Sequence, residues 1–140
     1  MTCGPTLYVG RSEVFNIPPD TATDLASVPR IFWALVPPSG AYENAAVLHD
    51  WFCQRLAAGD CLVSSRDADS LFRRVMRECH VGPLTRWAMW CGVRWGALFN
   101  PCRRPGWWRD APAVLAITAV LLAVLVGALL GLHLLLDLIL

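Results

Sequence analysis

Residues 45–54 read AAVLHDWFCQ, an apolar stretch that two adjacent polar side chains, His49 and Asp50, interrupt. The apolar residues recur three and four positions apart, which is the spacing of one face of an α-helix. This face comprises Ala45, Leu48, Phe52 and Leu56. Residues 39–42 have the composition of a helix start, and Gly59 predicts the end. The stretch therefore predicts a helix that buries one face and carries a histidine and an aspartate beside it.

Two further helices are expected after this one. Ser64, followed three residues later by Asp67, resembles a capping box, and the helix that it starts is predicted over residues 67–79. A Gly-Pro pair then precedes a third helix, predicted over residues 84–99. Its tryptophans have two interpretations, a core stripe or a belt at a membrane interface. They are Trp87, Trp90 and Trp95.

The N-terminal segment shows strand patterns instead. TLYVG and EVFNI predict two short strands joined by a turn at Gly10 and Arg11. The proline-rich residues 18–30 predict an ordered loop. We therefore predict an α+β class, mostly α: a short N-terminal β-hairpin and loop packed on a three-helix unit, followed by a C-terminal transmembrane helix.

Residues 113–136 form an apolar run in which His133 is the only strongly polar residue. A spanning helix needs about 20 apolar residues, so the run predicts a single transmembrane helix, with a buried core helix as the alternative. Arginines and tryptophans precede it, which predicts that the N-terminal part lies on the cytoplasmic side of the inner membrane. The predicted organisation is a soluble domain over residues 1–100, a juxtamembrane linker rich in arginine and tryptophan over 101–112, and the membrane helix.

The charge balance bears on the partners. The formal net charge is +1 at pH 7, with 12 basic and 11 acidic residues. Nucleic-acid binding would require a clustered basic face, so nucleic acid is not an expected partner. The expected partner is the lipid bilayer.

His49 and Asp69 form the candidate site. Two helices joined by a short loop are antiparallel neighbours, so these two side chains are expected to meet. A carboxylate that holds one imidazole nitrogen leaves the other free as a general base. Asp50 lies about 100° further around the helix and is left to bind a cation. The structural alternative is that His49 is a buried hydrogen-bonded residue and Asp69 a helix cap.

Four blocks, TDLASVPR, PSGAYENAAVLHDWF, DADSLFRRVM and GVRWGALF, occur in this order within residues 14–99. In these blocks the chain resembles the phage and prophage family catalogued as domain-of-unknown-function family 1353. The resemblance implies a phage or prophage origin, and other phage proteins as partners. It implies no particular activity.

AAVLHDWFCQRLAAGD followed by DADSLF is also similar to the helix pair of phospholipase A2, whose pattern is HDxxY and a later Ala-Asp. That resemblance implies that His49 is the base that activates water, that Asp69 orients it and that Asp50 binds calcium. Cys53 stands where the pattern has tyrosine. Residues 24–36 contain no glycine, although the resemblance implies a glycine-rich calcium loop there that supplies backbone ligands.

Asp24 offers another route to a divalent-cation site. If its loop folds over the helix pair, Asp24 would join His49, Asp50 and Asp69 in an oxygen-rich site with one imidazole. The alternative is that Asp24 caps a turn.

Two hypotheses about function follow. The first is a membrane-associated hydrolase with His49 and Asp69 as catalytic residues and Asp50, with Asp24, as the metal site. The second is a non-enzymatic phage lysis, assembly or superinfection accessory protein in which the His-Asp pair holds two helices together. A pair open to a cleft would favour the first hypothesis, and a pair sealed in the core the second.

Overall fold

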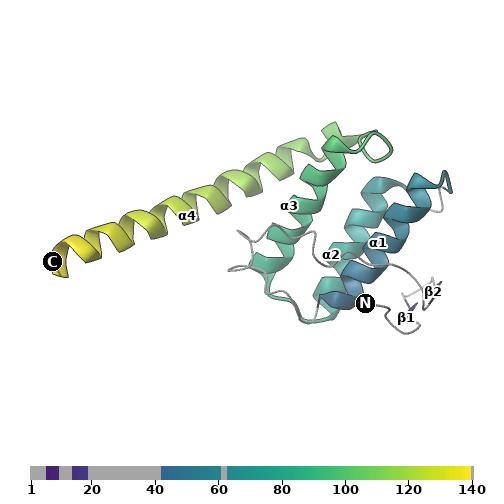
Figure 1. Cartoon of the computed structure of the whole chain (residues 1–140), viewed down its shortest axis with the longest axis horizontal. Helices are drawn as coiled ribbons and strands as arrows, with labels where there is room; N and C mark the ends of the chain where they lie inside the picture. The colour runs from purple at the N-terminus through teal and green to yellow at the C-terminus, as the bar shows by residue number, and fades with distance from the viewer. Residues whose placement is uncertain (1–5, 10–13, 19–41, 61–62, 140) are drawn as a thin grey trace.

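The computed structural model describes residues 6–9, 14–18, 42–60 and 63–139. In these ranges the chain forms strands β1 (Thr6–Val9) and β2 (Val14–Ile17), then helices α1 (Glu43–Ala57), α2 (Ser65–Glu78) and α3 (Pro83–Phe99). A short 3-10 helix, η3 (Trp107–Arg109), leads into the long helix α4 (Ala111–Ile139). Figure 1 shows α1 and α2 side by side, with α3 next to them and α4 leaving this unit as a single helix.

The α+β class predicted from the sequence is wrong, because the described part of the protein is helical. Its four α-helices contain 15, 14, 17 and 29 residues, whereas each strand contains 4. The two strands pair antiparallel with one another, Thr6 opposite Ile17 and Val9 opposite Val14. Ile17 of β2 is 1 % exposed and belongs to the main core, but a two-stranded ladder of this length forms no sheet layer, so the helices supply most of the core. The predicted loop over residues 18–30 lies almost entirely outside the described residues.

The helices begin and end close to where the spacing of apolar residues places them. The predicted cap of α2 is confirmed: the backbone N–H of Asp67 donates to the hydroxyl of Ser64 (3.1 Å), and that hydroxyl donates to the Asp67 carboxylate (2.7 Å). Pro83 occupies the first turn of α3, where its missing N–H costs no helical hydrogen bond.

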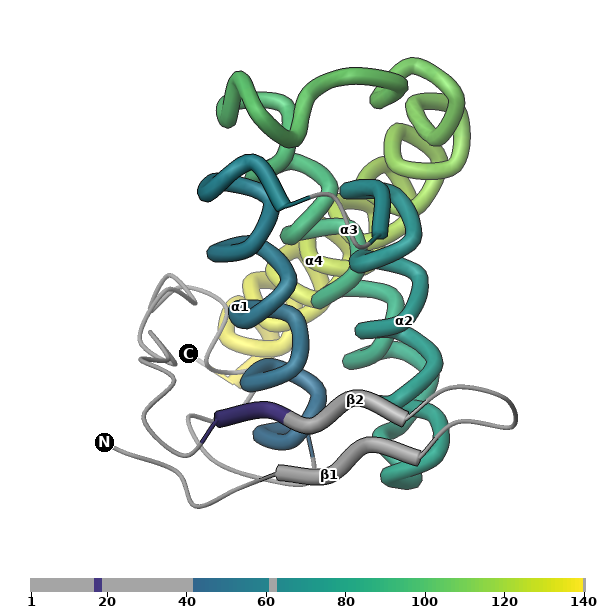
Figure 2. Tube along the Cα trace, turned by 90° about the vertical axis from the view of Figure 1, so that its right-hand side faces the viewer, coloured from purple at the N-terminus to yellow at the C-terminus, as the bar shows by residue number. Residues whose placement is uncertain are grey.

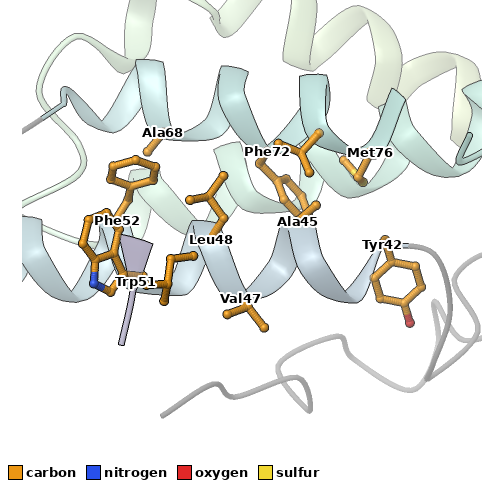
Figure 3. Packing of buried hydrophobic residues seen from close by; sticks show 11 residues of the cluster. Tyr42, Ala45, Val47, Leu48, Trp51, Phe52, Ala68, Phe72 and Met76 are labelled. Atoms are coloured by element: carbon orange, nitrogen blue, oxygen red, sulfur yellow. The ribbon is translucent and has the colours of Figure 1, made fainter. Parts of the chain in front are cut away.

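The main core lies between α1 and α2, two helices that Figure 2 shows side by side. Figure 3 shows buried side chains of this core at close range. Ala45, Leu48 and Phe52 of the predicted stripe are at most 1 % exposed. They belong to the same buried cluster as the inward face of α2, which consists of Ala68, Phe72, Val75 and Met76. Leu56, also predicted on the stripe, is only half-buried because α1 ends one residue later.

A second core joins α3 to the start of α4. Trp90 is buried there with Trp107 and Val114, which favours the core interpretation of the α3 tryptophans over an interfacial belt. The Thr118 hydroxyl accepts from the indole N–H of Trp95 (3.0 Å) and itself donates to the Val114 carbonyl (2.8 Å). The first two turns of α4 therefore pack against α3.

Beyond these turns α4 is exposed almost throughout. In the described part of the chain α4 is the one helix that is long and apolar enough to cross a membrane, and only 6 % of its apolar window is buried. A buried core helix is thus the wrong interpretation of this segment. Its length and composition are compatible with a membrane anchor.

Candidate functional site

His49 and Asp69 are brought together as predicted. The imidazole Nε2 of His49, in the middle of α1, lies 2.7 Å from Oδ1 of Asp69, in the second turn of α2. Both side chains are buried: Asp69 is 0 % exposed and His49 6 %. The ring of His49 also packs 4.9 Å from that of Phe72, so the pair forms part of the contact between the two helices.

Asp69 has two further partners that were not predicted. Nη1 of Arg94, in α3, donates to Oδ2 of Asp69 (2.9 Å), and Nη2 of Arg103, in the α3–α4 connection, donates to Oδ1 (2.6 Å). Arg94 is 1 % exposed and Arg103 9 %. Both oxygens of this fully buried carboxylate are therefore occupied, and two guanidinium groups place positive charge beside it.

The ion pairs continue to the start of α4. Nη2 of Arg94 lies 3.1 Å from Oδ2 of Asp110, and Nε of Arg66 donates to both oxygens of the same carboxylate (2.9 and 3.1 Å). The indole of Trp107 donates to the Arg94 carbonyl (2.6 Å), which fixes the connection against α3. We refer to the five buried members as the ionic network. They are His49, Asp69, Arg94, Arg103 and Asp110.

The contacts determine which nitrogen of His49 carries a proton. The oxygens of Asp69 accept from two arginines, and a carboxylate can only accept, so the 2.7 Å contact requires a proton on Nε2. Nη2 of Arg103, 3.3 Å from the same Nε2, then faces another donor and forms no hydrogen bond with it. The remaining nitrogen, Nδ1, lies 3.8 Å from a carboxylate oxygen of Asp50.

The surroundings of His49 also determine its charge. Burial lowers the pKa of His49, but the interactions with the carboxylates of Asp50 and Asp69 and with Cys53 outweigh burial and hold the pKa well above its ordinary value. A protonated imidazole donates from both nitrogens, to Asp69 from Nε2 and toward Asp50 from Nδ1. In that state His49 has no lone pair with which to accept a proton.

Asp50 and Cys53 lie at the edge of the network. The Asp50 side chain is 29 % exposed, and the Cys53 sulfur lies 3.8 Å from Nδ1 and 3.7 Å from Nε2 of His49. Asp24, the other predicted metal ligand, lies outside the described residues. Within the ranges that the structure describes, no group of three or more His, Cys, Asp or Glu side chains is arranged to hold a metal ion. The predicted calcium site thus stays a prediction.

Arg94 was missed although a sequence signal exists for it. It lies three residues from both Cys91 and Ala97, on the face of α3 that is buried, and a charge at a core position indicates a buried ion pair. Arg103 has no such signal, because its neighbour Arg104 is exposed and nothing local distinguishes the two. Arg103 was assigned to the charge that flanks a membrane helix, and Arg94 was given no role.

Comparison with known proteins identifies the family of the chain. Residues 3–93 match the family described as "Protein of unknown function (DUF1353)". The chain belongs to this family. It is also 45 % identical over 40 residues to the uncharacterised protein y4jT of Sinorhizobium fredii, a match that spans 27 % of this chain and 12 % of that protein. No solved structure matches the chain.

The DUF1353 match divides the ionic network. It includes His49 and Asp69 but ends at residue 93, directly before Arg94. Arg103 and Asp110 also lie beyond it. The DUF1353 region thus contributes the His-Asp pair, and the segment that follows contributes the arginines that neutralise Asp69.

The raised pKa of His49 predicts how the stability of this DUF1353 protein depends on pH. A group whose pKa is higher in the folded state stabilises the fold fully below its unfolded pKa, about 6.5. This contribution is lost as the pH rises through the folded pKa. We therefore expect the free energy of unfolding to decrease as the pH is raised above about 6.5.

Urea denaturation of the full-length protein in detergent micelles, at a series of pH values, measures this effect. The variant His49→Gln keeps a donor for Asp69 but cannot titrate, so it should lack this part of the pH dependence. Curves of the same shape for both proteins would contradict the prediction.

Proposed function

We propose that this DUF1353 protein is a membrane-anchored accessory protein that acts by binding other proteins, and that its His-Asp pair has a structural role. The observation that carries the proposal is the environment of Asp69. This carboxylate is 0 % exposed, and its oxygens contact His49, Arg94 and Arg103. Such a group holds α1, α2, α3 and the α3–α4 connection together.

The charges of the network support a structural role. With His49 protonated, each positive side chain of this cluster lies against a carboxylate: His49 against Asp50 and Asp69, Arg94 against Asp69 and Asp110, Arg103 against Asp69, and Arg66 against Asp110. A general base needs a free lone pair and access to water, whereas His49 is 6 % exposed and its raised pKa favours the form without a lone pair. The proposal therefore gives His49 no catalytic role.

Membrane anchoring through α4 sets the place of action. The helical unit would lie on the cytoplasmic side of the inner membrane, since the exposed Arg104 and Arg109 precede the apolar helix. The phage or prophage origin implied by the resemblance belongs to the same proposal. Its partners would be other phage proteins in lysis, assembly or superinfection control.

Fractionation tests the anchoring. Full-length protein should stay in the membrane fraction after a carbonate wash, and a chain that ends at Leu121 should be soluble. That truncation keeps the turns of α4 that pack on α3, which include Val114 and Thr118. Full-length protein in the soluble fraction would overturn the proposal.

A calcium-dependent hydrolase is the second candidate, favoured by one observation. Nδ1 of His49 faces Asp50, whose side chain is partly exposed at the edge of the network. In this alternative His49 is the base, Asp69 orients it, and Asp50 with Asp24 binds the cation.

Phospholipid release distinguishes the two candidates. We expect no release by wild-type protein incorporated into phospholipid vesicles, either with calcium or with a chelator. Release that requires calcium and is lost in His49→Ala would establish the hydrolase instead. Asp60→Asn, a change in an exposed ion pair at the end of the helix that carries His49, is the control for folding defects.

A further inference from the structure

The packing of α4 against α3 determines how deep His133 lies in a bilayer. The helix contacts α3 through Val114 and Thr118, so the part that lipid can surround begins near residue 119. Residues 119–139 extend about 31 Å at 1.5 Å per residue, which matches a hydrocarbon core of about 30 Å. His133 then lies about 21 Å along this span, inside the hydrocarbon, and Asp137 lies near its far edge. This depth rests on the proposed membrane anchoring.

His133 and Asp137 form a polar pair in this apolar helix. Nε2 of His133 lies 3.5 Å from Oδ2 of Asp137, and the two side chains are 72 % and 62 % exposed. In water the solvent would hydrate both side chains, and the pair would require no further partner. In hydrocarbon, ionisable side chains face the interior of a helix bundle or pair with other polar groups, because lipid cannot solvate them.

The pair lies on a face of α4 that the rest of the described chain leaves uncovered. Going back from Asp137 in steps of four and three residues gives a continuous seam. It consists of Ala119, Ala123, Val126, Leu130, His133 and Asp137, all of them exposed. Val114 and Leu121 lie on the opposite side of the helix, and Thr118, which contacts α3, lies about 100° around the helix from Ala119. The seam therefore remains available when α4 is packed on α3.

We propose that α4 pairs in parallel with α4 of a second copy of this chain, through the seam that carries His133 and Asp137. Two copies inserted in the same membrane orientation present the seam at the same depth. When two parallel helices pair through residues spaced four and three apart, each seam residue inserts among four residues of the facing helix. One of these four is the next seam residue of the facing helix. His133 of one copy then meets Asp137 of the other, and the contact is repeated by symmetry.

Charge complementarity favours a second copy as the occupant. The seam offers one basic and one acidic side chain a single turn apart, so its own duplicate satisfies both. The alanines at positions 119 and 123 let the two helices approach closely at the near end of the span.

Sedimentation equilibrium of the full-length protein in density-matched detergent micelles tests the pairing. We expect wild-type protein to be dimeric, and the double variant His133→Leu/Asp137→Leu to dimerise about tenfold more weakly, given the usual strength of interhelical hydrogen bonds. These substitutions make the span more apolar, so insertion is retained. The matched control Leu132→Ala/Leu135→Ala, at the same depth on the other side of α4, should dimerise like wild type.

The outcomes separate this inference from the proposed function. Wild-type protein that resists carbonate extraction but sediments as a monomer, or equal effects of the two double variants, would overturn the pairing alone. Wild-type protein found in the soluble fraction would overturn the membrane anchoring and the pairing with it.

Discussion

Replacing Asp69 with asparagine is expected to lower the free energy of unfolding by about 3 to 5 kcal/mol, the usual cost of removing one member of a buried ion pair. The substitution keeps the shape of the side chain but removes its charge. Arg94 and Arg103, both nine-tenths or more buried, would then lack their shared counter-ion. One oxygen of the carboxylate would also become an amide nitrogen that donates, facing groups that donate as well.

Urea denaturation followed by circular dichroism, with the full-length protein in detergent micelles, measures this loss. Asp60→Asn is the matched control, because it makes the same chemical change in a pair with Arg55 whose two side chains are both 43 % exposed. Exposed pairs of this kind contribute about 0 to 1 kcal/mol. An Asp69 variant no less stable than the Asp60 variant would show that the network does not hold the helices together.

The helices could be predicted because their signals are local. The spacing of Ala45, Leu48 and Phe52 and the cap at Ser64 depend on residues within one or two turns of each other. The fold class was predicted less well than the helices. Alternating polarity in two four-residue segments suggested a sheet component. In the described part of the chain these strands form a ladder only with each other, and Ile17 joins a core that is otherwise helical.

The candidate site could be predicted in part for the same reason. His49 and Asp69 were expected to meet because consecutive helices with a short connection are neighbours. The arginines that neutralise Asp69 come from 25 and 34 residues further along the chain. No local pattern connects residues so far apart, and Arg103 in particular becomes a buried partner only when the connection after α3 folds back. This tertiary contact is the observation that supports the structural role proposed for the pair, the second of the two hypotheses drawn from the sequence.

Replacing Arg94 with methionine is expected to cost about 3 kcal/mol, because this arginine joins the two carboxylates of the network. Its guanidinium lies 2.9 Å from Asp69 and 3.1 Å from Asp110. Methionine fills most of the same volume, so the loss reports charge rather than a cavity. Arg74→Met is the control, since Arg74 in α2 forms an exposed ion pair with Glu78, one turn further along α2.

The double variant Asp69→Asn/Arg94→Met gives a sharper test of the ionic network. It removes both charges of the ion pair between Asp69 in α2 and Arg94 in α3, whose side chains are almost fully buried. Residues of one buried network do not act independently, so the double change should cost less than the sum of the single changes, by roughly 0.5 to 3 kcal/mol. The same urea denaturation measures all three variants. Additive losses would mean that Asp69 and Arg94 stabilise the fold separately, and the structural role proposed for the His-Asp pair would then lose its physical basis.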